Sequence, residues 1–158
     1  HEGFIYIADF KNHRVQKFTQ DGNFVAAFGS HGTKRGQLSY PNSVAVDPEG
    51  DVYVCDWSEN GWEQGRVHIY EKDGRFLTSL TGDAQQLSLW AQMTVDANAD
   101  YGKRRREVNS TEPEWRFAQP TAVMYDAKNS RVVVADTQRS RFQIYDKQAT
   151  YMVPQLNL

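Results

Sequence analysis

Three aspartates recur in this chain at places where carboxylates could act as general bases. Each one ends a short apolar run, and an arginine follows it after a short polar loop. The aspartates are Asp9, Asp56 and Asp136, and the arginines are Arg14, Arg66 and Arg141. Their presence in every copy of a repeat argues against catalysis. We predict a structural role, in which each carboxylate accepts hydrogen bonds from the backbone or from its arginine at the end of a strand.

Other reactive groups lack a catalytic setting. The chain has no Walker loop, G-x-S-x-G elbow, HExxH motif or paired CxxC motif. His68 stands where the other copies have Gln16 and Gln143, which indicates a polar position on a strand. Cys55 is the single cysteine and lies in an apolar run, so we expect it to be buried. We therefore predict no catalytic residue, no cofactor and no metal.

These residues are carried by a repeat of short strands. In the middle copy, alternating apolar and polar residues predict strands at 42–47, 52–56, 66–70 and 76–80. In the last copy the same pattern predicts strands at 121–126, 131–136 and 141–146, with an outer strand at 151–153. The first copy begins at Phe4 and lacks its innermost strand. Four short antiparallel strands in about 40 residues are typical of a β-propeller blade.

One turn between these strands is rich in acids. Asp47, Glu49 and Asp51 alternate with Pro48 and Gly50. This composition is typical of a hairpin turn. Calcium binding is the alternative for such oxygen ligands, and we favour the turn.

The repeat divides the chain into four parts. We expect a first blade with its interblade loop at 1–40 and a second blade at 41–82. A mainly helical insertion follows at 83–119, and a third blade with a C-terminal tail at 120–158. The fold class is therefore all-β.

Composition restricts the class of protein further. The chain has 158 residues, of which 39% are hydrophobic and 13% aromatic, as in a compact globular domain. Its formal charge of −2 provides no global attraction to nucleic acid or to an anionic membrane. No run of 18 apolar residues occurs, so we expect no membrane span. The chain shows no targeting segment, and both a cytoplasmic and a secreted location remain open.

Several motifs resemble the NHL repeat family. They are Asn12-His13-Arg14-Val15-Gln16-Lys17-Phe18, Gly36-Gln37-Leu38 and Pro41-Asn42-Ser43-Val44-Ala45-Val46-Asp47-Pro48-Glu49-Gly50. The resemblance covers about three-quarters of the chain and leaves out residues 83–118. It implies a six-bladed ring, of which this chain supplies about three blades.

An open arc of three blades would expose two apolar blade faces and an unpaired strand edge. We therefore expect the ring to be completed elsewhere. The remaining blades could come from a longer version of the same chain, from a second copy, or from another subunit. The first is favoured, and a stable monomer of this length would contradict the expectation.

Two insertions interrupt the repeat. One is the loop at 57–65, which is five residues longer than its counterparts, and the other spans 83–119. In a propeller both connections emerge on the same side of the ring. All four tryptophans lie in the insertions: Trp57, Trp62, Trp90 and Trp115. Tryptophan is enriched at binding sites, so these residues are candidate partner contacts. Packing against one another as a small core is the alternative.

The long insertion begins with a helical pattern. Asp83 fits an N-cap with Gln86 three residues later. Leu87, Trp90, Ala91 and Thr94 follow at the spacing of one helix face. We expect this helix to end at 98–102 and a second one at 103–108.

The only basic run is Lys103-Arg104-Arg105-Arg106. Some NHL propellers bind RNA on a basic face, which makes Arg104, Arg105 and Arg106 candidate contacts. Residues 83–119 nevertheless hold five basic and six acidic side chains. This balance favours a solvated or internally paired segment over a phosphate-binding one.

We predict a non-enzymatic protein-interaction scaffold that binds through the face carrying the Trp-rich insertions. One alternative, implied by the resemblance, is a metal-dependent lyase or hydrolase with a site in the central channel. A second is an RNA-binding propeller.

Overall fold

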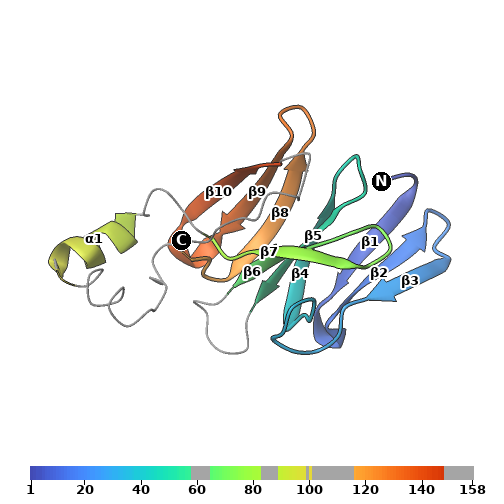
Figure 1. Cartoon of the computed structure of the whole chain (residues 1–158), viewed down its shortest axis with the longest axis horizontal. Helices are drawn as coiled ribbons and strands as arrows, with labels where there is room; N and C mark the ends of the chain where they lie inside the picture. Colours follow the sequence, from blue (N-terminus) through green and yellow to red (C-terminus); the bar gives the residue numbers. More distant parts are fainter. Residues whose placement is uncertain (58–64, 83–88, 99, 101–115, 148–158) are drawn as a thin grey trace.

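The computed structural model describes residues 1–57, 65–82, 89–98, 100 and 116–147. They form three antiparallel sheets, shown in Figure 1. The first contains β1 (Phe4–Asp9), β2 (Arg14–Thr19) and β3 (Phe24–Phe28), with a 3₁₀ turn at Phe10–Asn12. The second contains β4 (Tyr40–Val46), β5 (Val52–Trp57), β6 (Arg66–Tyr70) and β7 (Phe76–Leu80). The third contains β8 (Pro120–Asp126), β9 (Arg131–Asp136) and β10 (Arg141–Asp146), with a 3₁₀ turn at Thr137–Arg139.

Each sheet is one blade, and we name them blades 1, 2 and 3 in chain order. Neighbouring strands in each blade are also neighbours in sequence, so every blade is a simple meander. The prediction of an all-β fold built from propeller blades is confirmed. The outer strand expected at 151–153 lies outside the described residues.

One α-helix is described, α1 at Leu89–Ala97. It falls within the predicted helical segment of the insertion. The predicted cap at Asp83 and the second helix at 103–108 lie outside the described residues. Among the described helices, none is long and apolar enough to cross a membrane.

The two faces of each blade carry different side chains. Cross-strand partners share a face, as Tyr53 and Ile69 or Val54 and His68 do in blade 2. We call the face with Val52 and Val54 the leading face, and the face with Tyr53, Cys55, Val67 and Ile69 the trailing face. Asp9, Asp56 and Asp136 are equivalent residues of the three blades, so counting from them along the chain identifies the same face in each blade.

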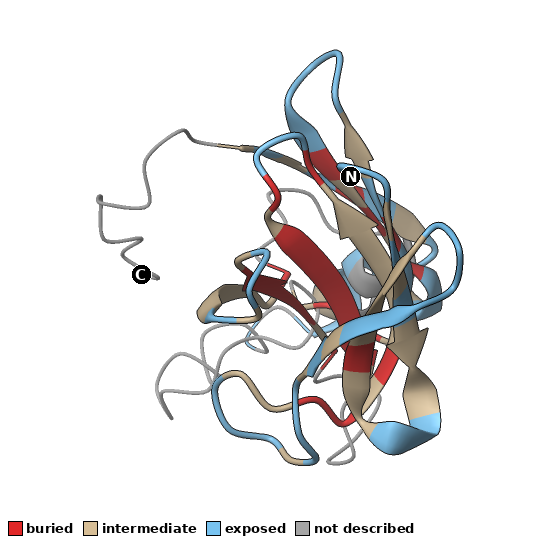
Figure 2. Ribbon diagram, turned by 90° about the vertical axis from the view of Figure 1, so that its right-hand side faces the viewer, coloured by how far each residue is buried: buried red, intermediate tan, exposed pale blue. Residues whose placement is uncertain are grey.

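Blades pack through unlike faces. The trailing face of blade 2 packs on the leading face of blade 3, where Val132 and Val134 are almost fully buried. The leading face of blade 2 packs on the trailing face of blade 1, where Val15 is buried. Figure 2 shows the buried residues, coloured red, along strands in the interior of the molecule. The core therefore lies between the blades.

The long insertion leaves and re-enters the sheets at one point. The Phe117 amide donates to the Thr81 carbonyl at 2.9 Å. Gly82, with φ of +90°, lies so close that a Cβ there would be 2.3 Å from the Phe117 nitrogen. The two ends of the connection are therefore held together by direct contacts between Thr81, Gly82 and Phe117.

Candidate functional site

The β1–β2 and β9–β10 turns, the β3–β4 loop and the adjoining ends of β5, β6, β7 and β8 lie at one side of the molecule, and we call this side the loop face. The β4–β5 and β8–β9 hairpins lie at the opposite side, at the top of Figure 1. Both Trp-rich insertions connect strands whose adjoining ends lie at the loop face.

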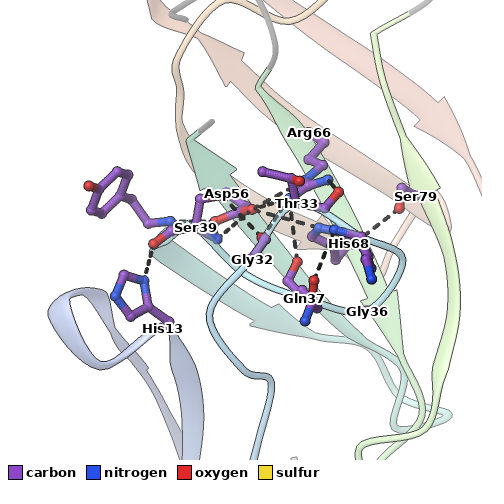
Figure 3. Close-up of polar contacts among 12 residues, drawn as sticks. His13, Gly32, Thr33, Gly36, Gln37, Ser39, Asp56, Arg66, His68 and Ser79 are labelled. Atoms are coloured by element: carbon purple, nitrogen blue, oxygen red, sulfur yellow. Dashed lines mark hydrogen bonds and ion pairs between the residues drawn. The ribbon is translucent and has the colours of Figure 1, made fainter. Parts of the chain in front are cut away.

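Asp56 organises the loop face in blade 2 (Figure 3). Its buried carboxylate accepts hydrogen bonds from the backbone amides of Ser39 and Tyr40 at 2.7–3.0 Å. It also accepts from Arg66 Nε and Nη2, both at 3.2 Å. Arg66 in turn donates to the carbonyls of Thr33, Gly32 and Gln37. The interblade loop is therefore held to blade 2 by a saturated carboxylate, which leaves no lone pair directed at a substrate.

The other two aspartates make related contacts. Asp136 is buried and accepts from the Ala118 amide at 2.6 Å and from Arg141 Nε at 2.7 Å. Asp9 is more accessible and accepts from Asn12, Arg14 and Gln16 at 2.7–3.0 Å. Burial alone would raise the pKa of Asp9, but these three donors outweigh it and the pKa is lowered.

His68 replaces a glutamine in this arrangement. Gln16 and Gln143 donate to the aspartate of their own blades at 2.7 and 3.2 Å. His68 is fully buried, with Nε2 3.7 Å from Asp56 and Nδ1 3.1 Å from Ser79 Oγ. Burial lowers the pKa of His68, although Asp56 acts in the opposite direction. The substitution therefore places an ionisable group at a position that is neutral in blades 1 and 3.

An aromatic row crosses the loop face from blade 1 to blade 2. Its rings are those of His31, His13, Tyr40, Phe10 and Trp57, in that order. The four successive centroid distances are 4.1, 5.8, 5.2 and 5.6 Å. His31 is exposed and the other four side chains are half-buried. The rings come from two connections, the start of β4 and the end of β5, and together they form one continuous surface.

Two members of the row are fixed by polar contacts. The Trp57 Nε1 donates to the Pro120 carbonyl in blade 3 at 2.9 Å. The His13 imidazole hydrogen-bonds through Nδ1 to the Ser39 carbonyl. Sequence reasoning selected Trp57 but missed Phe10 and Tyr40. Phe10 follows Asp9 as Trp57 follows Asp56, and this shared position is the signal that could have revealed it.

Charge is divided between the two sides of the molecule. Among described residues, the loop face outside the long insertion carries the three aspartates and seven cations: Lys11, Arg14, Lys34, Arg35, Arg66, Arg139 and Arg141. Arg116 is a further cation in the described part of the insertion. The described part of the insertion adds Asp96 and Asp100. The described residues of the loop face therefore carry more cations than carboxylates, although the chain as a whole carries −2. The blades cause this separation, because they send loops to one side and hairpins to the other.

On the hairpin side, Lys147 occupies the centre of the acidic turn. Its Nζ contacts Asp47, and lies 3.1 Å from Glu49 and 3.0 Å from Asp51. Burial works against the charge of Lys147, but hydrogen bonds to the three carboxylates outweigh it and raise the pKa. Asp47 also accepts from three backbone amides of its own turn. The Lys147 ammonium group thus lies among the three carboxylates for which calcium binding was the alternative interpretation.

Several candidate residues lie outside the described part of the chain, namely Trp62, Trp115, Arg104, Arg105 and Arg106. Trp90 lies on α1, but its side chain is not described. Within the described ranges, no group of three His, Cys, Asp or Glu side chains could hold a metal.

The repeat has a counterpart among known families. A family model described as the NHL repeat matches residues 2–18 and 38–65. Two stretches of the chain therefore match the NHL repeat. The two matched stretches include the Asp9–Arg14 and Asp56 elements of the loop face, and the resemblance noted in the sequence is confirmed.

Curated relatives resemble part of the chain. Protein brain tumor of Drosophila melanogaster is 39% identical over 74 residues, which are 46% of this chain and 7% of the relative. Protein lin-41 of Caenorhabditis elegans is 39% identical over 54 residues, which are 34% of this chain and 4% of the relative. The chain described here therefore spans only a small part of the length of these relatives.

Solved structures share the fold. A protein of unknown function from Bacteroides thetaiotaomicron has a TM-score of 0.58 at 19% identity, over 92% of this chain and 32% of its own. An auxiliary nutrient binding protein from the same organism has a TM-score of 0.53 at 16% identity, over 90% of this chain and 34% of its own. These neighbours are β-propeller proteins, and at such identities the likeness concerns the fold alone.

Proposed function

We propose that this chain is part of a non-enzymatic binding scaffold whose NHL blades hold a protein partner against the loop face. The aromatic row from His31 to Trp57 is the observation that carries the proposal. Aromatic side chains provide a large contact area at low entropic cost. Trp57 is the central anchor, and Trp62, Trp90 and Trp115 extend the contact from the insertions.

The repeated carboxylates support binding rather than catalysis. Asp56 and Asp136 are buried and saturated by amides and arginines of the scaffold. They hold the loops in place before a partner arrives, which reduces the ordering cost of association. The row is therefore a pre-formed surface at the ends of the strands.

Native lysines allow the proposal to be tested by cross-linking with a lysine-reactive reagent and mass spectrometry. Lys11 and Lys34 lie on the loop face, whereas Lys72 and Lys128 lie on the hairpin side. We expect a bound protein to cross-link to Lys11 and Lys34. A Phe10→Ala/Trp57→Ala variant should lose these cross-links while its circular dichroism is unchanged. Cross-links confined to Lys72 and Lys128 would contradict the proposal.

RNA is the second candidate partner, and the excess of cations among the described loop-face residues is the observation that favours it. Beyond the three arginines paired with aspartates, the described residues of this face carry four further cations outside the insertion, namely Lys11, Lys34, Arg35 and Arg139, and Arg116 within it. Phosphate contacts release counterions and make affinity depend on salt. Exposed rings could stack on unpaired bases.

The RNA candidate predicts a specific salt dependence in a gel shift with single-stranded RNA. Replacing Lys11, Lys34 and Arg35 with glutamate should weaken binding and reduce the slope of log affinity against log salt by about 2, at about 0.7 per phosphate contact. The matched control replaces Lys72, Arg75 and Lys128 on the hairpin side and should leave the slope unchanged. Equal effects of the two triple variants would indicate non-specific attraction.

A further inference from the structure

The three blades differ at the residue beside the repeated aspartate. Gln16 and Gln143 donate directly to the carboxylate of their own blades. In blade 2 the residue is His68, whose side chain is 1% exposed and whose Nε2 lies 3.7 Å from Asp56 Oδ2. Among the described residues, this nitrogen has no hydrogen-bond partner. A buried polar nitrogen without a partner lowers stability, and a glutamine avoids that cost in the two other blades.

The carboxylate beside His68 also holds the β3–β4 loop, residues 29–39 (Figure 3). Asp56 accepts hydrogen bonds from the backbone amides of Ser39 and Tyr40, where the loop meets β4. Arg66 is bound to the same carboxylate and donates to three backbone carbonyls between residues 32 and 37. His68 is therefore in contact with the group that anchors the whole loop.

The position of the β3–β4 loop sets the geometry of the aromatic row. His31 belongs to the loop, Tyr40 follows it directly, and the Ser39 carbonyl accepts from His13 Nδ1. Three of the five rings thus depend on contacts that this loop makes. A change in the contacts that anchor the loop would displace these rings relative to the rest of the row.

Within the described part of blade 2, two charged groups act on His68, and they act in opposite directions. Asp56 on β5 favours the imidazolium, whereas Arg66 on β6 disfavours it. Tyr70 on β6 is also ionisable, with its ring centre 5.9 Å away, and burial raises the pKa of its phenol so that it stays neutral. The neighbours of His68 on β7 are uncharged, namely Ser79 and Phe76.

Lys17 and Arg35 also lie at the interface between blades 1 and 2, each placed on an aromatic ring. Lys17 is on the face of blade 1 that packs on blade 2, and its Nζ lies 4.1 Å from the ring centre of Phe4 and 5.2 Å from that of Tyr6. Arg35 of the β3–β4 loop lies 5.7 Å from the ring centre of Phe76. Burial, Asp56 and Arg66 are what shift the pKa of His68, and neither of these two cations contributes. The remaining side chains that blade 1 and the loop bring to the interface are apolar: Val15, Phe28 and Leu38.

We propose that protonation of His68 releases the β3–β4 loop and thereby takes the aromatic row apart at acidic pH. In the imidazolium both nitrogens carry a proton, so Nε2 becomes a charged donor beside Asp56 Oδ2. That oxygen already accepts from Arg66, and two cations on one buried carboxylate repel each other. Arg66 is the cation that leaves, because its side chain is 16% exposed and reaches water, whereas His68 is 1% exposed.

Release of Arg66 also removes its bonds to the loop carbonyls, and the opened loop gives His68 access to water. Protonation and opening therefore favour each other. Because burial lowers the pKa of His68 in the closed state, the change occurs below pH 6.5. The consequence for a partner rests on the proposed function: a protein held by the aromatic row would be released on acidification.

Hydrogen exchange followed by NMR tests the proposal on the 158-residue chain alone. The measured quantity is the protection factor of the Ser39 and Tyr40 amides, which donate to Asp56. We expect it to fall by up to about tenfold per pH unit as the pH decreases from 6.5 towards the pKa of His68 in the folded chain. The Ala118 amide is the internal control, because it donates to the equivalent aspartate in blade 3, beside a glutamine. Its protection should stay constant, and a similar fall at both sites would overturn the proposal.

Two variants assign the response to one imidazole. His68→Gln should abolish the fall, because glutamine serves at this position in the other blades and does not titrate. The matched control is the double variant His13→Gln/His31→Gln, which removes the two imidazoles at the other end of the loop contacts and should retain the fall. Circular dichroism at pH 7.5 confirms that both variants fold. A fall that persists in His68→Gln, or that disappears in the double variant, would assign the response to another group and overturn the proposal.

The ring protons of His68 provide a second measurement that needs no variant. Their NMR shifts should titrate with the same midpoint as the protection of Ser39 and Tyr40. An imidazole that stays neutral until β5 and β6 lose protection together would show global unfolding in place of loop release, and would also overturn the proposal. These measurements need no partner, so their outcome is separate from that of the cross-linking experiment at neutral pH, which tests the proposed function.

Discussion

Asp56 and Asp9 occupy the same position in successive blades, but their carboxylates differ in surroundings. The Asp56 side chain is 0% exposed and holds two backbone amides and Arg66. The Asp9 side chain is 18% exposed and accepts hydrogen bonds from the side chains of Asn12, Arg14 and Gln16. Removing one partner of a buried charge pair leaves the other unsatisfied, which makes the cost depend on burial.

We therefore expect Asp56→Ala to lower the free energy of unfolding by about 3 kcal/mol. Asp9→Ala, the same change in blade 1, should cost less than about 1 kcal/mol because water replaces the lost acceptor. Urea unfolding followed by circular dichroism measures both. Equal losses would show that the contribution of each aspartate to stability depends on its position in the repeat rather than on its burial.

His68 makes the stability of blade 2 depend on pH. Its pKa in the folded chain lies below the ordinary value of 6.5, because the buried imidazole is kept neutral. The unfolded chain therefore binds more protons in this range, so stability is full above about pH 6.5 and decreases as pH falls towards the folded pKa. Each unit of lowering corresponds to about 1.4 kcal/mol.

His68→Gln should remove this part of the pH dependence, because glutamine already serves at the same position in blades 1 and 3. The measurement is the difference in unfolding free energy between pH 7.5 and pH 5.5, compared between parent and variant. The other histidines and the carboxylates are common to both and cancel. An unchanged difference would show that His68 does not titrate with folding.

At the scale of elements, Lys147 joins two blades. It follows β10 of blade 3 and contacts the β4–β5 turn of blade 2, 100 residues earlier in the chain. Its loss would leave Asp47, whose side chain is 0% exposed, without a cation. Lys147 therefore adds a polar contact to the apolar interface between blades 2 and 3. This contact lies on the hairpin side, opposite to Asp56 on the loop face.

Lys147→Met keeps the aliphatic stem and removes the charge. We expect the free energy of unfolding to fall by about 2–3 kcal/mol. Lys128→Met in the exposed β8–β9 turn is the control and should change stability by less than about 0.5 kcal/mol. Thermal unfolding of the two variants shows whether the lysine at the blade junction contributes more to stability than an exposed lysine. Equal losses in the two variants would contradict this expectation.

The strands were predictable because each blade repeats an alternating pattern around one aspartate and one arginine. The aromatic row was not, because Phe10, His13 and Tyr40 meet only after the blades fan out and bring separate connections together. The pairing of Lys147 with Asp47 was equally hidden, since no local pattern links residues so far apart. The excess of cations among the described loop-face residues was also hidden. It becomes visible only when the loops are separated from the hairpins in space, and the net charge of the chain does not show it.

For the whole molecule, the hydrogen bond from Phe117 to Thr81 predicts that the long insertion is dispensable for folding. Replacing residues 83–115 with an eight-residue glycine–serine linker should change the unfolding free energy by no more than about 1.2 kcal/mol, because each halving of the length of such a loop is worth about 0.6 kcal/mol. Hydrogen exchange of the strand amides provides a second measurement. Loss of protection in β7 or β8 would show that the insertion supports the blades.

The single cysteine provides a built-in reporter of blade separation. Cys55 lies in the interface between blades 2 and 3, is 0% exposed, and burial raises the pKa of its thiol. An alkylating reagent can reach this sulfur only when the two sheets part, because the reactive thiolate neither forms nor meets solvent in the closed state. The rate of alkylation under native conditions thus gives the opening frequency of one propeller junction without any introduced label.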